Sequence, residues 1–377
     1  MNNLGTLYRF EIKKILKNRV TQVMLVILCI ITILEAIVPG LSVTRDKRDA
    51  RMELNGRIID DTLLNEMYQN IDDNGHSSTP NNEKYFGICY LEQTSIPGPD
   101  NVLADYTAED MYRAREEQIL GYMDDIELSD QIITHWKETM KKTEKPFKYI
   151  YSCGSLFLSQ GLGVMMLIIM LWSALCLTTV FTIEYRQRTD QIVLSSRNGR
   201  KETYLVKLSA GLSVIIASTV FATGLLTVLI FVIYGSSGFD SIVQLSSIFS
   251  AYPFSMGQFI IIQMVIMITV VIMYAVFAMV VSIFTKNSLA VMGMMFGAYL
   301  FGELDVLSDK AGNISFLRAL MPSYVISTRS LSEYRMLNIG GKLFTIYVAS
   351  PILYLLISII LTVIGSMVYE RGQVNGR

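Results

Sequence analysis

The chain has 377 residues, of which 51% are hydrophobic and only 17% are charged, and its mean hydropathy is positive. This composition is typical of a polytopic membrane protein. The formal net charge is -1, so the overall charge gives no support for a nucleic acid partner, and the distribution of cations among the loops becomes the informative quantity.

The first element in chain order, residues 1–19, is basic and amphipathic. In the stretch LYRFEIKKILKNR, apolar side chains gather on one side while five lysines and arginines supply positive charge. We therefore expect a helix in the lipid headgroup plane on the cytoplasmic side. The alternative is an ordinary positively charged flank of the span that follows.

Six runs are long or apolar enough to cross a membrane. They are residues 20–41, 154–183, 208–234, 258–284, 288–304 and 346–369. The first is too long for a signal-peptide core, and the fifth is the shortest. The sequence therefore predicts an all-α polytopic membrane protein with six transmembrane helices.

The distribution of lysine and arginine predicts the orientation. Cations precede the first run, follow the second, and recur after the fourth and sixth, all on one face of a six-span bundle. That face is expected to be cytoplasmic, with both termini and the 370–377 tail on it. The short loop 235–257 has no lysine or arginine, whereas five cations in the last outer segment weigh against the assignment.

Residues 44–152 are then predicted to form a mainly helical extracellular domain between spans 1 and 2. Thr107 and Asp110 are spaced as a helix cap, Ser129 can cap a second helix, and a third is expected near residues 48–71. Between them, turns and a short strand at YFGICYL, residues 85–91, are expected. Cys89 and Cys153 both fall outside the membrane in this scheme, so a disulfide between them is left open.

The last outer segment, residues 305–345, is more than a loop. Apolar residues recur at helical spacing in residues 314–321 and 324–337, on either side of Pro322. These are predicted to be short re-entrant or interfacial helices.

A charged stretch that contains Gly199, residues 184–207, lies between the second and third spans. Its central TDQIVLSS can continue as an amphipathic turn, and RNGR interrupts the helix before a new one begins near Lys201. By itself it could be a solvated loop.

The order of these elements resembles the permease subunit of ABC-2-type exporters. That family's second span ends in Glu, followed by Thr, a Leu-Leu-Ser-like run, a small-residue break with Arg, and a Lys opening the third span. The resemblance implies that the turn docks on a separate cytoplasmic ATPase. The matching residues here are Glu184, Thr189, Leu194, Ser195, Arg197, Gly199, Arg200 and Lys207. The proline often found in the break is absent, which leaves the conformation of the turn open.

Catalytic motifs are not apparent. A phosphate-binding loop requires Gly-x4-Gly-Lys-Ser/Thr, and the nearest stretch, IGGKLF around Lys342, lacks the first glycine and the hydroxyl residue. The two histidines, His76 and His135, show no metal-binding spacing. We therefore expect no enzyme activity, no catalytic or metal-binding residues and no cofactor on this chain, with ATP and Mg²⁺ bound by the partner ATPase.

Polar residues within spans are candidates for a substrate route. They are Glu35, Gln160, Gln263 and Glu303. Residues such as Gln160 and Gln263 can equally make hydrogen bonds between helices, and carboxylates near a span end can simply reach the interface.

The expected function is export or removal of a peptide or lipid-like amphipathic substrate, such as an antimicrobial peptide, across a bacterial plasma membrane. The expected partners are the ATPase, a second permease and membrane lipid. The alternatives are a membrane sensor or scaffold that transports nothing, and a mechanotransmitting ABC permease.

Overall fold

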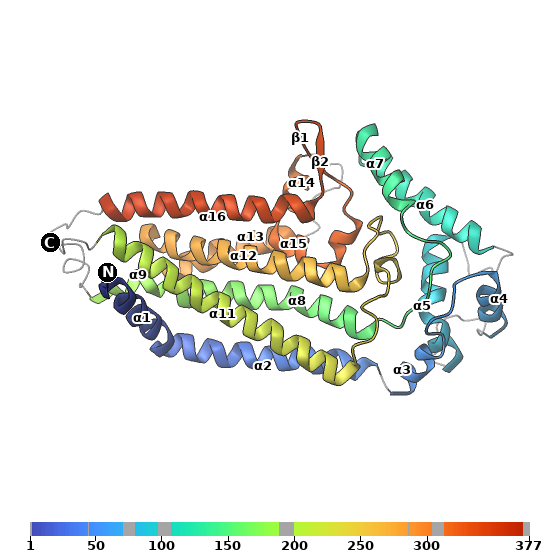
Figure 1. Ribbon diagram of the computed structural model, residues 1–377, viewed down its shortest axis with the longest axis horizontal. Coiled ribbons are helices and arrows are strands. Elements are labelled where there is room, and N and C mark those ends of the chain that lie inside the picture. The colour runs from blue at the N-terminus through green and yellow to red at the C-terminus, as the bar shows by residue number, and fades with distance from the viewer. Residues whose placement is uncertain are drawn as a thin grey trace.

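The computed structural model describes residues 2–43, 45–70, 80–96, 107–187, 200–285, 287–303 and 313–371. Figure 1 shows an elongated molecule in which long helices run side by side and a cluster of shorter helices covers one end. The start of α1 (Asn2–Lys17) and the end of α16 (Ile346–Arg371) lie at the opposite end. We call that end the inner end and the covered end the outer end.

Within the described residues, five helices are long and apolar enough to cross a membrane. They are α2 (Arg19–Ser42), α8 (Cys153–Trp172) with its continuation to Ile183, α11 (Lys201–Tyr234), α12 (Met256–Thr285) and α16 (Ile346–Arg371). The predicted all-α membrane architecture is confirmed. Since α11 has 34 residues, it is about 51 Å long and projects beyond a hydrocarbon core of roughly 30 Å.

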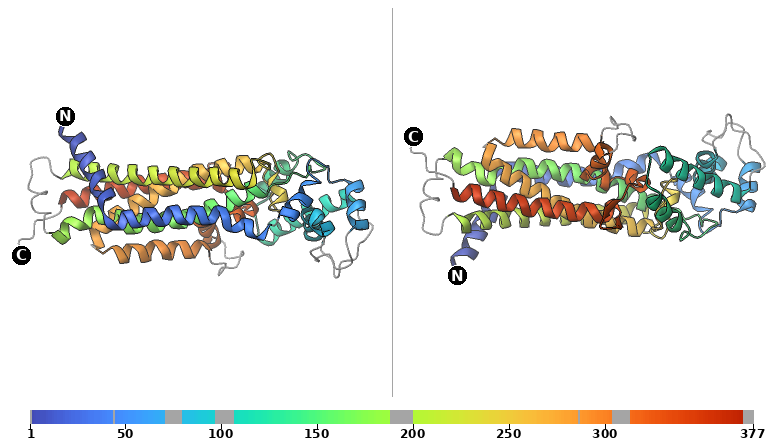
Figure 2. Two further views of the ribbon diagram at one scale, coloured as in Figure 1. Left: turned by 90° about the horizontal axis from the view of Figure 1, so that it is seen from below. Right: turned by 90° about the horizontal axis from the view of Figure 1, so that it is seen from above.

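The predicted fifth span corresponds to α13 (Ser288–Glu303), an apolar helix of 16 residues. It runs alongside the long helices in both views of Figure 2. At 1.5 Å per residue it is about 24 Å long, which is shorter than the hydrocarbon core. A count of six complete spans therefore stays a prediction.

The amphipathic segment forms α1 (Asn2–Lys17), which crosses the inner end of the bundle at an angle to α2 (Figures 1 and 2). The side chain of Asn18 accepts a hydrogen bond from the Val20 N–H and so caps the start of α2. A single residue thus separates the two helices.

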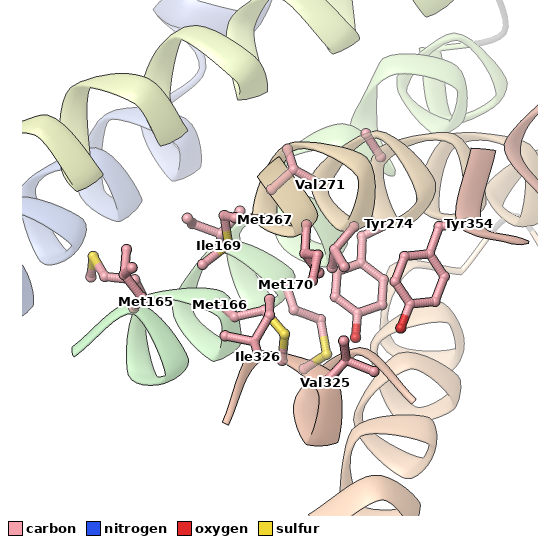
Figure 3. Close-up of a cluster of buried hydrophobic side chains, with 14 of the residues drawn as sticks. Met165, Met166, Ile169, Met170, Met267, Val271, Tyr274, Val325, Ile326 and Tyr354 are labelled. Carbon is pink, nitrogen blue, oxygen red and sulfur yellow. The ribbon is translucent and has the colours of Figure 1, made fainter. Parts of the chain in front are cut away.

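The bundle core is rich in methionine. Figure 3 shows Met166 and Met170 of α8 in one cluster with Met267 of α12 and Tyr354 of α16. Met165 of α8 faces α2, where its sulfur accepts a hydrogen bond from Thr32 Oγ1 at 3.4 Å. Unbranched thioether side chains adapt to irregular gaps between packed helices. In α8 the regular helix is interrupted by a π-helical segment, Ser173–Leu177, before α9 (Thr179–Gln187) continues to the inner end.

The outer domain is helical. Its helices are α3 (Arg45–Met52), α4 (Asp61–Asn70), α5 (Pro80–Ser95), α6 (Ala108–Asp125) and α7 (Asp130–Met140). The predicted cap of α6 is present, because Thr107 and Asp110 exchange side-chain and backbone hydrogen bonds. The helix expected near residues 48–71 is instead two helices, α3 and α4.

The strand predicted at residues 85–91 is wrong, since this stretch lies within α5. Tyr85, Ile88 and Leu91 recur at helical spacing and are all buried in the core of the outer domain. Cys89 and Cys153 are both free thiols in the structure, so the disulfide left open by the sequence is not formed.

The last outer segment contains α14 (Asn313–Ala319), α15 (Pro322–Ile326), a 3-10 turn (Thr328–Ser332) and an antiparallel hairpin of β1 (Leu337–Ile339) and β2 (Lys342–Phe344). The helix expected over residues 324–337 is therefore wrong beyond Ile326. The IGGKLF stretch is the hairpin itself, and Gly340 and Gly341 adopt the positive φ angles, 59° and 83°, that a two-residue turn requires.

Candidate coupling site at the inner end

The turn between the second and third spans is bounded by α9 and α11. Of the predicted coupling residues, Thr189, Leu194, Ser195, Arg197 and Gly199 lie outside the described residues. Glu184 lies on α9, in the part where the structure describes the backbone only, whereas Arg200 and Lys207 are fully described. The structure therefore describes this site through the two helices that flank the turn, α9 and α11.

The α11 flank is tied to the inner end of α16. Arg200 donates a hydrogen bond from Nη1 to the Glu370 carbonyl oxygen at 2.8 Å. One turn further along α11, the Tyr204 hydroxyl donates to the Thr362 carbonyl oxygen at 2.9 Å. The two helices can approach this closely because residue 365 is glycine: a Cβ atom there would lie 2.4 Å from the Tyr204 hydroxyl oxygen.

An aromatic cluster joins the two flanks to each other. The rings of Phe181 on α9, Tyr204 on α11 and Tyr369 on α16 lie with their centroids 5.6 to 5.8 Å apart. Such ring contacts contribute packing energy beyond the buried area. The inner ends of α9 and α11 therefore pack against each other and against Tyr369 of α16.

Lys207 is fully buried beside this cluster, with its ammonium group 5.4 Å from the centroid of the Phe181 ring. The sequence predicted that it lies on the turn and contacts the ATPase. The structure places it two turns inside α11, because α11 begins at Lys201, so it offers no surface to a partner in this conformation. Lys207 can therefore influence the turn only indirectly, by fixing the position of α11.

Helix α1 is attached to the same helices. The Tyr8 hydroxyl donates to Ser213 Oγ on α11 at 2.6 Å, and Asn18 Nδ2 donates to Thr179 Oγ1 at 3.3 Å. Ile15 is buried in the bundle core, whereas Phe10 is 61% exposed. One face of α1 is thus fixed on α9 and α11, and the other is open at the inner end.

The predicted substrate-route residues are not brought together. Gln263 is buried and donates from Nε2 to the Ile326 and Ser159 carbonyl oxygens at 2.6 and 3.2 Å, so it joins α12 to α15 and α8. Glu303 closes α13 and pairs with Arg329 at 3.4 Å. Glu35 is half-buried on α2 and Gln160 is exposed on α8.

Sequence reasoning missed Tyr8, Tyr204, Gly365 and Tyr369. A hydroxyl-bearing aromatic one turn into an apolar helix is a usable signal, since a buried tyrosine hydroxyl normally finds a partner. The partners themselves are distant in sequence and could not be read from it.

The fold and this end of the bundle define a helical, multi-pass membrane protein whose amino-terminal amphipathic helix packs on the bundle. A family model described as ABC-2 family transporter protein matches residues 6–372, nearly the whole chain. The chain therefore belongs to the ABC-2 transporter family and is an ABC transporter permease, a membrane component of transport. Comparisons with curated proteins and with solved structures give no match.

Proposed function

We propose that this permease exports an amphipathic, peptide or lipid-like substrate, and that a separate cytoplasmic ATPase drives it through the turn between α9 and α11 and through α1. ABC-2 permeases normally work with such an ATPase, which supports the partner. The working unit would contain two permeases, identical or related, and two ATPases that bind ATP and Mg²⁺.

The bracing of the turn is the observation that carries the proposal. Its α11 flank is bonded to α16 through Arg200 and Tyr204, and α11 is bonded to α1 through Tyr8. A displacement applied to the turn would therefore be passed to three helices rather than absorbed by a loose loop. ATP binding would shift the population between two arrangements of these helices if the ATPase contacts differ between them.

The substrate class is supported by the outer end. Helix α7 packs on the bundle there: Trp136 is buried, stacks edge-on against Tyr252 at 4.8 Å, and donates to the Tyr334 carbonyl oxygen at 2.8 Å. The outer domain thus shares a core with the outer ends of the spans. A domain fixed at this position can receive an amphipathic molecule leaving the outer leaflet.

The sidedness of the turn tests the proposal. A thiol introduced by Gly199→Cys should resist a membrane-impermeant maleimide in intact cells and react after permeabilisation. Lys141→Cys, on the exposed end of α7, is the matched control and should react in intact cells. Labelling is compared with the parent chain, which carries its own four cysteines. Reaction of Gly199→Cys from the exterior would invert the topology and refute the proposal.

A further inference from the structure

A groove of about 800 Å³ lies at the inner end between α1, the start of α2, the end of α9 and the start of α13. This volume is within the range of small-molecule sites. The groove sits where α1 meets α2 at Asn18, which is the level at which the interfacial helix turns into a span. With the topology of the proposed function, on which this inference rests, the groove opens at the headgroup level of the inner leaflet.

One wall of the groove is cationic. Lys13, Lys14 and Lys17 of α1 line it, and none of the described lining residues is acidic. Lys14 forms an ion pair with Glu11 at 3.4 Å, just outside the lining set. Lys13 and Lys17 are one helical turn apart and exposed, so their ammonium groups reach the same space.

The opposite wall supplies uncharged hydrogen-bonding groups. Thr179 and Thr182 come from the last part of the second span, and Asn287 and Ser288 come from the start of α13. Asn287 accepts a hydrogen bond from the Leu289 N–H and so caps that helix. The Thr179 and Thr182 hydroxyls donate to the Cys176 and Thr178 carbonyl oxygens, so the phosphate donors of this wall are the Ser288 hydroxyl and the Asn287 side-chain amide. A hydroxyl and an amide donor facing lysines are a suitable environment for a phosphate group.

Apart from Asn18, the remaining lining is apolar and continues into the lipid-facing surface. Val20 and Leu289 line the groove and are 44% and 68% exposed, and the exposed side chains of Val23 and Ile27 continue along α2 beyond Val20. A ligand with a phosphate between the two walls could lay an acyl chain along this surface. A free anion would leave the apolar part unused.

We propose that the groove binds an anionic phospholipid of the inner leaflet, with its phosphate between Lys13 and Lys17 on one side and Asn287 and Ser288 on the other. Charge complementarity favours an anionic over a zwitterionic headgroup, and the apolar continuation favours a lipid over a soluble phosphate. The lipid would fill the space between α1 and α13 and hold α1 at the membrane surface.

The test uses the purified full chain in mild detergent, equilibrated with equal amounts of phosphatidylglycerol and phosphatidylcholine and read by native mass spectrometry. The wild type should retain phosphatidylglycerol preferentially. Each cation near the surface contributes about a factor of five to anionic lipid binding, so Lys13→Gln/Lys17→Gln should lower the retention by roughly 10- to 30-fold. Both residues are exposed, so the variant is expected to fold.

The control, Lys201→Gln/Arg371→Gln, removes the same charge from exposed positions at the same end but outside the groove, and should retain the lipid. Equal loss in the two variants would show non-specific attraction and overturn the site. A third arm adds excess glycerol 1-phosphate. Full displacement of the lipid by this soluble headgroup would overturn the lipid assignment, and failure to displace it supports the acyl-chain contact.

Discussion

Arg115 attaches the outer domain to the bundle, and its replacement tests that attachment most strictly. This arginine of α6 is buried and donates from Nε to the Ile248 carbonyl oxygen and from Nη2 to the Ser250 carbonyl oxygen, both at 2.6 Å. Its guanidinium also lies 5.6 Å from the centroid of the Phe147 ring. Burial lowers the pKa of Arg115, but arginine stays protonated in proteins, so these are charge-assisted hydrogen bonds.

Replacement by Arg115→Met keeps much of the stem and removes both donors. Hydrogen bonds from charged groups contribute about 1.5–3 kcal/mol each, and the loss is partly offset because no guanidinium has to be desolvated. We expect a net cost near the low end, about 3 kcal/mol, for separating α6 from the 248–250 loop. Since 1.36 kcal/mol is a factor of ten, local opening should become roughly 100-fold more frequent.

Amide hydrogen exchange followed by mass spectrometry measures this opening. Exchange should accelerate in α6 and in the loop before α12 while the inner end of the bundle is unchanged. Arg113→Met is the control on the same helix, because Arg113 is exposed and solvent screens its pairing with Asp110. Equal exchange in the two variants would refute the reasoning that Arg115 holds the outer domain on the bundle.

Three further outcomes follow from the packing and the charges. Gln263→Leu removes the donor to the Ile326 carbonyl and should lower thermal stability in detergent by about 1 kcal/mol; an unchanged midpoint would show that the bridge is dispensable. Gly365→Ala places a methyl group 2.4 Å from the Tyr204 hydroxyl oxygen and should destabilise the inner end, and adding Tyr204→Phe should recover part of the loss; no recovery would place the strain elsewhere. Hydrogen bonds from Tyr85 and then Arg57 lower the pKa of Glu66 below its ordinary 4.5, so the stability they provide is present above that pH and is lost as pH falls toward the folded-state pKa. In Glu66→Gln, the acid-induced loss of outer-domain structure, followed by near-ultraviolet circular dichroism, should therefore depend less on pH than in the wild type. Identical titration curves for the two proteins would contradict this prediction.

Patterns that depend on neighbouring residues could be predicted from the sequence. The apolar runs gave the long helices, and the Thr107–Asp110 pair gave the cap of α6, because both signals act within a few residues of chain. The fifth run was harder, since its helix ends at Glu303 and is short for a complete span.

Features set by distant contacts could not be predicted in the same way. YFGICYL reads equally well as a strand or a helix, and burial of Tyr85, Ile88 and Leu91 against the rest of the outer domain selects the helix. Lys207 looks like a cation of the turn until α9 places Phe181 beside it. At the site, the sequence indicated the turn, but its attachment to α16 depends on carbonyl groups more than 150 residues away.

Site-specific photocrosslinking tests the central claim most directly. A benzophenone amino acid at Leu194 in the full chain, expressed in its native host and irradiated in membranes, should form an adduct that mass spectrometry identifies as an ABC ATPase. The same amino acid at Lys141 should form none. If Leu194 gives no such adduct while the permease is folded and inserted, or if Lys141 gives it equally, the turn is not where the ATPase engages this permease.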